Sequence, residues 1–131
     1  MCMIDYGDGT VRMLENARLV TALKRHKCAE CWRQIEVGEK YHREKFVFDD
    51  EFTTHKTCAH CMVVRNWLAD ECGGWLFGEV QEDAADHARG YGPDLARVVI
   101  GMRWKWRGPS GRLLPVPARI QTGDELRLKK G

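Results

Sequence analysis

The chain has 131 residues, of which 44% are hydrophobic and 31% charged, a balance that predicts one globular domain and excludes a disordered protein. Its net charge of +2 is too small to indicate nucleic-acid binding by itself. No apolar run approaches the ~20 residues that span a bilayer, and no charged start followed by an apolar segment opens the chain, so we expect a cytoplasmic protein without a membrane partner.

The N-terminal half predicts mainly strands. Residues 1–10 form a lead-in that ends in a turn, and residues 11–25 fit either a helix or a strand, because their apolar positions satisfy both periods. The aromatic and β-branched residues of 40–48 indicate a strand, and 51–56 indicate the strand that returns beside it.

The C-terminal half predicts helices. Apolar residues recur at helical spacing from Cys58 up to the stop at Gly73–Gly74, and 79–89 predicts a short acidic helix. Pro93 suits the first turn of a helix that reaches Trp106. A strand is the alternative there, since "MRWKWR" alternates and a glycine costs a helix roughly 1 kcal/mol, but we favour the helix. Residues 108–111 read as a turn and the last ten residues as a polar tail.

Two Cys-x2-Cys pairs carry the main functional signal. They are separated by 26 residues and consist of Cys28, Cys31, Cys58 and Cys61. In a reducing compartment such clustered cysteines indicate a metal site rather than disulfides. Four thiolates would close the tetrahedral shell of one zinc ion, which is the structural kind of zinc site and leaves no position for a catalytic water.

His55 provides an alternative ligand. Together with Cys28, Cys31 and Cys58 it gives a spacing seen in LIM-like and PARP-like fingers. We favour the four-cysteine set, because Cys58 and Cys61 lie three residues apart in the first turn of the predicted helix, where the helix dipole stabilises thiolates.

The remaining histidines and cysteines are expected to have no role in the site. His60 lies inside the second pair and is expected to face solvent, as are His26 and His42. Cys2 and Cys72 read as small apolar residues.

The order of these elements resembles a treble-clef zinc finger: a knuckle with two ligands, a β-hairpin, and a helix whose first turn carries two more. The fold class we expect is therefore α+β, with a treble-clef-like zinc finger over 24–72 extended by C-terminal helices and a basic segment over 79–116, within a single domain of 1–131. The segments "HKCAEC", "KTCAHC" and "RNWLADECGG" also resemble a family of small, mostly uncharacterised proteins of bacteriophages and prophages. That resemblance implies a viral origin and the cytoplasm of a bacterial host. It implies no established activity.

Charge is distributed unevenly in the C-terminal half. Seven acids and one base lie between Asp70 and Asp94, whereas six bases and no acid lie from Arg97 to Arg119. Each block reads either as a solvated face or as one end of a bipolar surface, and only the basic block could meet a phosphate backbone.

Because a structural zinc contributes folding energy and no chemistry, the function must come from a surface. We expect a binding module for a host or viral protein, such as a complex of host defence, since tryptophan and arginine are enriched at interface hot spots. Trp32 and Trp104 are the tryptophans expected to be exposed, and Trp67 and Trp75 the ones expected in the core. The residues we assign to partner binding are Arg103, Trp104, Lys105 and Arg107.

The sequence is compatible with two other classes of function. A nucleic-acid-binding protein is the main alternative, because segment 97–112 interleaves bases with aromatic residues in a way that suits phosphate contact and base stacking. An HNH-like nuclease is the residual one, since some of these enzymes use a treble clef. It would need a general base and ligands for an open metal, but His42 and His55 lie on different strands and Asn66 has no partner at helical spacing. The acidic cluster of the predicted 79–89 helix reads as solvated, so we expect no enzyme.

Overall fold

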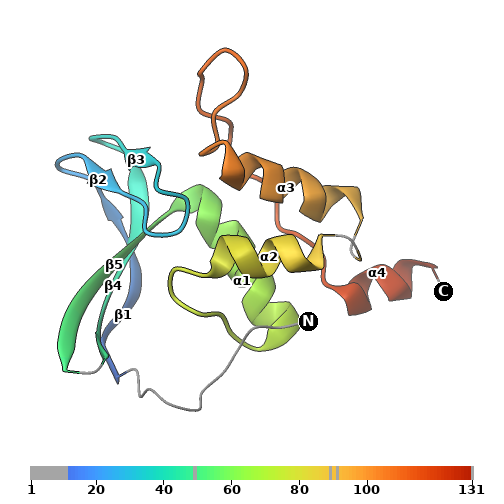
Figure 1. Cartoon of the computed structure of the whole chain (residues 1–131), viewed down its shortest axis with the longest axis horizontal. Helices are drawn as coiled ribbons and strands as arrows, with labels where there is room; N and C mark the ends of the chain where they lie inside the picture. The colour runs from blue at the N-terminus through green and yellow to red at the C-terminus, as the bar shows by residue number, and fades with distance from the viewer. Residues whose placement is uncertain (1–11, 49, 89, 91, 131) are drawn as a thin grey trace.

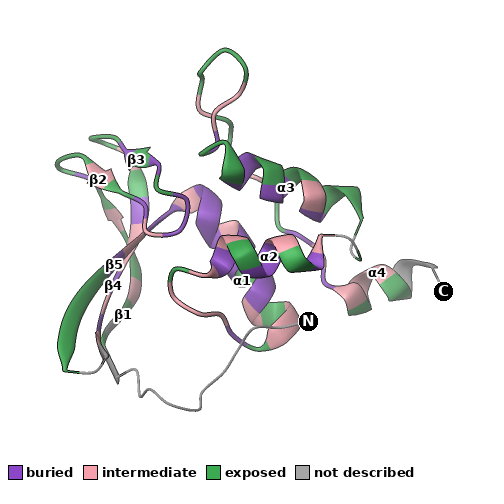
Figure 2. Cartoon of the chain, viewed as in Figure 1, coloured by how far each residue is buried: buried purple, intermediate pink, exposed green. Residues whose placement is uncertain are grey.

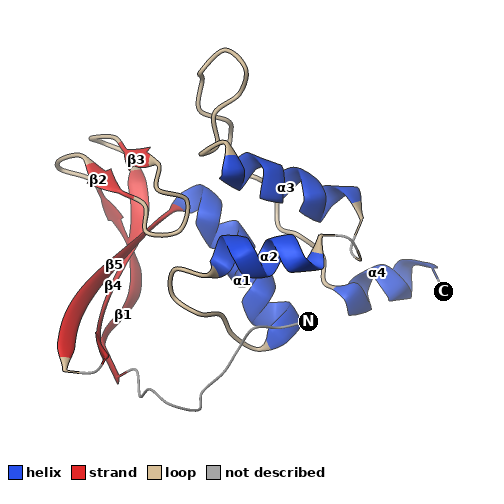
Figure 3. Ribbon diagram, in the orientation of Figure 1, coloured by secondary structure: helices blue, strands red, loops and turns tan. Residues whose placement is uncertain are grey.

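The computed structural model describes residues 12–48, 50–88, 90 and 92–130, and it has a mixed α+β fold with its strands on one side and its helices on the other (Figures 1 and 3). This confirms the predicted α+β class. Its elements, in chain order, are β1 (Arg12–Thr21), β2 (His26–Lys27), β3 (Gln34–Ile35), β4 (Lys40–Phe48), β5 (Glu51–Cys58), α1 (Ala59–Cys72), α2 (Val80–His87), α3 (Pro93–Arg103) and α4 (Gly123–Lys130).

The larger sheet is antiparallel, with strand order β1-β4-β5. The pattern of 11–25 fitted either a helix or a strand, and the structure has the strand β1 there. It pairs with β4 from Arg12↔Val47 to Thr21↔Lys40. Two register shifts interrupt that ladder between Met13 and Arg18. The predicted hairpin of β4 and β5 is confirmed, with Tyr41 opposite Cys58 at the end nearest the helices.

The smaller sheet is the two-stranded pair β2 and β3, and its connecting loop carries the first cysteine pair. The loop is closed by backbone bonds from Cys28 N to Arg33 O (2.8 Å) and from Trp32 N to Cys28 O (3.0 Å). Trp32 adopts a left-handed conformation with φ of 66°, which lets so short a loop reverse direction.

Helix α1 ends at Cys72, just before the predicted glycine stop. It begins at Ala59, so Cys58 precedes the helix in an extended conformation (φ −65°, ψ 157°) and does not lie in its first turn as we expected. Gly73 caps it in the left-handed conformation (φ 80°) and donates its N–H to Ala69 O at 2.9 Å. The buried side of α1 is the centre of the core (Figure 2), with Val64, Trp67 and Leu68 at most 1% exposed. Arg65 is buried too, and its guanidinium pairs with the buried carboxylate of Glu44.

The favoured helix over the "PDLARVVIGMR" segment is also confirmed, but α3 ends at Arg103 and does not reach Trp106 as we expected. A Schellman arrangement closes it: Lys105 N donates to Met102 O (3.0 Å) and Trp106 N donates to Gly101 O (2.7 Å). Lys105 and Trp106 have φ of 54° and 59°. The chain therefore turns back on the helix and presses the Trp106 side chain against it.

The prediction of a polar tail is wrong for the described part of the C-terminus, which forms α4. Thr122 and Glu125 start this helix as a capping box: Glu125 N donates to Thr122 Oγ1 at 3.3 Å, and Thr122 N donates to Glu125 Oε1 at 3.4 Å. Gly123 N also donates to Glu71 Oε2 of α1 at 2.9 Å, which joins the two helices.

Among the helices described, none has the length and apolar character that crossing a membrane would require.

Candidate metal centre

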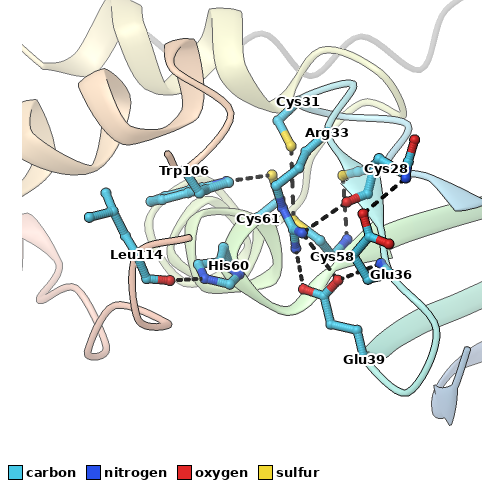
Figure 4. Close-up of polar contacts among 11 residues, drawn as sticks. Cys28, Cys31, Arg33, Glu36, Glu39, Cys58, His60, Cys61, Trp106 and Leu114 are labelled. Atoms are coloured by element: carbon cyan, nitrogen blue, oxygen red, sulfur yellow. Dashed lines mark hydrogen bonds and ion pairs between the residues drawn. The ribbon is translucent and has the colours of Figure 1, made fainter. Parts of the chain in front are cut away.

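The structure brings the two Cys-x2-Cys pairs together at one point (Figure 4). Cys28 and Cys31 come from the loop between β2 and β3, Cys58 is the last residue of β5, and Cys61 lies in the first turn of α1. All four side chains are buried, and their Sγ atoms all lie within 4.8 Å of one another. Four buried sulfurs this close could hold a metal ion.

The spacing of the sulfurs suits tetrahedral coordination of one metal ion. Zinc–thiolate bonds of about 2.3 Å place the sulfurs at the corners of a tetrahedron with edges of about 3.8 Å. The Sγ atoms of Cys31 and Cys58 lie 3.9 Å apart. The donor set consists of four soft sulfurs, which is the set that zinc and iron–sulfur centres use and that magnesium and calcium do not.

The thiols perturb one another strongly. Hydrogen bonds from Cys28 and then from Cys31 lower the pKa of Cys58, while burial and the neighbouring sulfurs raise the pKa of Cys61 well above its usual range. The hydrogen bond with Cys28 likewise raises the pKa of Cys31. The raised pKa values of Cys31 and Cys61 favour their protonated thiols. A cation bound by the four sulfurs would displace these protons, so metal binding would release protons.

Two further donors orient the sulfurs. The backbone N–H of Cys58 donates to Cys28 Sγ at 3.3 Å, and the indole Nε1–H of Trp106 donates to Cys61 Sγ at 3.3 Å. Such hydrogen bonds hold thiolates in place and offset part of their charge. Trp106 is 3% exposed. Sequence reasoning assigned it only to a helix face, because nothing local to its position indicates contact with a cysteine 45 residues away.

Arg33 adds a buried positive charge beside the centre. It is 2% exposed and forms a two-point ion pair with Glu39, with Nη2 to Oε1 at 2.7 Å and Nη1 to Oε2 at 3.1 Å. The hydrogen bond to Glu39 raises the pKa of Arg33 against the opposing effect of burial, and the nearby Cys58 sulfur contributes in the same direction. A guanidinium in this position would partly neutralise a centre of four thiolates.

The alternative ligand His55 lies elsewhere. Its Nε2 is 2.8 Å from Oε2 of Glu30, and both residues are buried. The same carboxylate accepts the backbone N–H groups of Gly78 (2.9 Å) and Val80 (3.2 Å) at the start of α2. His55 does not belong to the sulfur cluster found in the described residues. Glu30 lies in the loop between β2 and β3, so its contacts connect that loop to His55 of β5 and to the start of α2.

The expectation that His60 faces solvent is wrong. It is 3% exposed, and its Nε2 donates to Leu114 O at 2.6 Å. His26 and His42 are half-buried rather than exposed. Cys72 is half-buried, and its Sγ lies 3.7 Å from Nε2 of His87. Cys2 lies outside the described residues.

The residues assigned to partner binding divide into two groups. Arg103, Trp104 and Lys105 are exposed at the end of α3, whereas Arg107 is half-buried and donates from Nη1 to Gly111 O at 3.4 Å. Three of the four tryptophan predictions are confirmed, since the exposed fractions are 61% for Trp32 and 70% for Trp104, against 1% for Trp67. Trp75, which we expected in the core, is only half-buried and packs against it.

The acidic cluster of α2 is not uniformly solvated. Glu82 and Asp86 are exposed, but Asp83 and His87 are buried. His87 Nδ1 lies 2.8 Å from Asp83 O and 3.4 Å from its Oδ1, and the imidazole ring packs edge-on against Trp67 at 5.2 Å. These two residues belong to the core between α1 and α2.

No family model, curated protein sequence or solved structure matches this chain.

Proposed function

We propose that the chain is a zinc-binding module that holds one structural zinc ion through Cys28, Cys31, Cys58 and Cys61 and acts by binding a partner. The observation that carries the proposal is the convergence of four buried sulfurs within 4.8 Å of one another. Four thiolates fill a tetrahedral shell, so the ion stabilises the fold and has no open position for a water or a substrate. A catalytic role is not part of this proposal.

The order of elements supports a treble-clef-like finger. A loop with two cysteines is followed by the β4–β5 hairpin and then by α1, which begins at the second pair. Helices α2 and α3 pack beyond α1 and would extend the finger.

The end of α3 is the surface we assign to the partner. Trp104 is 70% exposed between two exposed cations, Arg103 and Lys105. Lys105 occupies the left-handed position after the helix, which glycine fills most easily. Strained backbone of this kind is often found where a side chain is needed for binding. A flat, rigid indole beside two cations is typical of an interface hot spot.

We propose a protein as the partner. The resemblance of the cysteine segments to bacteriophage proteins leads us to propose a host or viral protein complex in the bacterial cytoplasm, with a host defence complex as the specific candidate. Such an interaction requires a stable recognition surface and no chemistry, which is what a structural zinc module supplies.

Nucleic acid is the second candidate, and a specific observation favours it. The exposed group Arg103, Trp104 and Lys105 combines two cations for phosphates with an aromatic face on which a base can stack. The exposed basic surface is small, however, because Arg107 is half-buried and its Nη1 donates to Gly111 O. A protein partner therefore remains the first proposal.

An affinity capture from bacterial lysate tests this proposal when it is run with and without nuclease. The zinc-loaded full chain is the bait, and Trp104→Ala is compared with Phe52→Ala as a matched control. Phe52 is also an exposed aromatic residue (79% exposed) but belongs to β5, next to the β4–β5 turn at the far end of the hairpin (Figure 1).

A protein that persists after nuclease treatment, is lost with Trp104→Ala and is retained by Phe52→Ala supports the proposal. Material that disappears with nuclease, or whose binding falls steeply between low and moderate salt, supports the nucleic-acid alternative, since phosphate contacts are strongly salt-dependent. Equal capture by both variants would overturn the assignment of this surface.

A further inference from the structure

The three-stranded sheet carries a row of positive charges across its strands. Arg43 of β4 lies directly opposite Lys56 of β5 and, on its other side, opposite Arg18 of β1. Directly opposed residues point to the same face of a sheet, and like charges in such positions destabilise it. The Arg43–Lys56 pair therefore costs stability in the absence of an anion.

A hollow of about 620 Å³ opens beside this row. Three of its lining residues are cations, Lys24, Arg43 and Lys56, and hydroxyl groups come from Thr21 and Thr54. No acidic residue is among the described residues that line it. Nor do Lys24, Arg43 and Lys56 form a side-chain hydrogen bond or an ion pair with any other residue that the structure describes. Their charges thus face the hollow without a counter-charge from the described chain.

These groups match the chemistry of a phosphate. An arginine fork and ammonium groups form charge-assisted hydrogen bonds with phosphate oxygens, and threonine hydroxyls add neutral donors. Arg43 and Lys56 belong to the adjacent strands β4 and β5, so the sheet holds their backbones in place without a ligand. A preformed arrangement of this kind reduces the entropy that binding would otherwise cost.

We propose that this hollow, formed by Thr21, Lys24, Arg43, Thr54 and Lys56, binds a phosphate group. The group can belong to a small phosphorylated molecule or to a nucleic-acid backbone. The site shares no residue with the end of α3 or with the four cysteines, although Lys56 is two residues from Cys58 and its backbone O accepts the N–H of Ala29 at 2.7 Å. The inference therefore goes beyond the proposed function.

The test is an NMR titration of the ¹⁵N-labelled, zinc-loaded full chain with inorganic phosphate, against sodium chloride at equal ionic strength. We expect saturable shifts at Thr21, Arg43 and Thr54. Lys56→Ala and Lys24→Ala should each weaken binding about tenfold, in keeping with the loss of one charge-assisted hydrogen bond. Lys40→Ala is the matched control, because Lys40 is exposed on β4 but does not line the hollow.

A second arm replaces phosphate with a twelve-nucleotide single-stranded oligonucleotide. Binding of both probes with the same dependence on Lys24 and Lys56 identifies a backbone phosphate as the source, and binding of phosphate alone identifies a small phosphorylated ligand. Either outcome supports the site. The absence of saturable shifts with both probes, or an equal loss of binding with Lys40→Ala, would overturn it. Zinc content is measured in every variant, so that a loss of phosphate binding can be distinguished from a loss of the metal ion.

Discussion

The indole N–H of Trp106 donates to the Sγ of Cys61 across 3.3 Å, although the two residues are 45 positions apart. This bond connects the turn after α3 to the cysteine cluster (Figure 4). It gives the C-terminal extension a direct role beside the proposed metal ion, because groups that donate to a ligating thiolate adjust its charge and its position.

Trp106→Phe tests that role. The substitution keeps an aromatic ring in the core but removes the N–H donor, so we expect zinc affinity to fall by about 10- to 100-fold. Competition with a chromophoric chelator measures the affinity. Trp104→Phe is the control and should leave the affinity unchanged, because Trp104 is 70% exposed. Equal affinity in the wild type and Trp106→Phe would contradict the account.

Gly101→Ala should destabilise the fold even though alanine is the better helix former. A Cβ atom at Gly101 would lie 2.6 Å from Cζ3 of Trp106 and 2.7 Å from its Cε3. Such overpacking typically costs about 1–3 kcal/mol of unfolding free energy. Gly108→Ala serves as the control, since its nearest contact is an ordinary 3.4 Å to the flexible Leu114 side chain. Urea denaturation compares the two, and a gain in stability for Gly101→Ala would refute the close packing.

Lys105→Gly should have opposite effects on stability and on binding. The left-handed φ of 54° at this residue is unfavourable for lysine and easy for glycine, so we expect a stabilisation of about 1 kcal/mol. Loss of the exposed ammonium should at the same time weaken capture of the partner. Thermal melts and the capture assay measure the two effects. A loss of stability would show that the lysine side chain supports the fold.

His55→Ala distinguishes the two ligand sets. Because Nε2 of His55 lies 2.8 Å from the buried carboxylate of Glu30, the substitution removes one of its three hydrogen-bond partners, and we expect a loss of about 1–3 kcal/mol. Zinc content should nevertheless stay at one ion per chain. Elemental analysis of the purified variant measures it. A fall to zero in protein that remains folded would favour the set of His55 and three cysteines.

Local patterns in the sequence were sufficient for several elements. The Cys-x2-Cys spacing, the apolar stripe of α1 and its glycine stop depend on residues within a few turns of one another, and the structure agrees with each. The alternation in 11–25 remained ambiguous because both periods fitted it. Only pairing with β4, a partner distant in sequence, decides for a strand.

Other features depend on contacts that no local pattern contains. Trp106 fits the helical period of α3, yet it lies in the core because the chain reverses after Arg103. Glu30 and Arg33 are charged residues that general tendencies place at the surface. Both are buried with a partner: the backbone N–H groups of Gly78 and Val80 donate to Glu30, and the Arg33 guanidinium pairs with Glu39. For α4 the signal was available, since Thr122 and Glu125 have the spacing of a capping box.

The zinc content of the protein tests the central proposal most directly. Inductively coupled plasma mass spectrometry of the purified chain should give one zinc per molecule. Cys31→Ser and Cys58→Ser should each lose the ion and unfold, because small zinc modules depend on their metal for stability. Ala29→Ser, which introduces the same side chain between two of the proposed ligands, should retain one zinc. A Cys31→Ser protein that kept both its zinc and its melting temperature would contradict the four-cysteine centre.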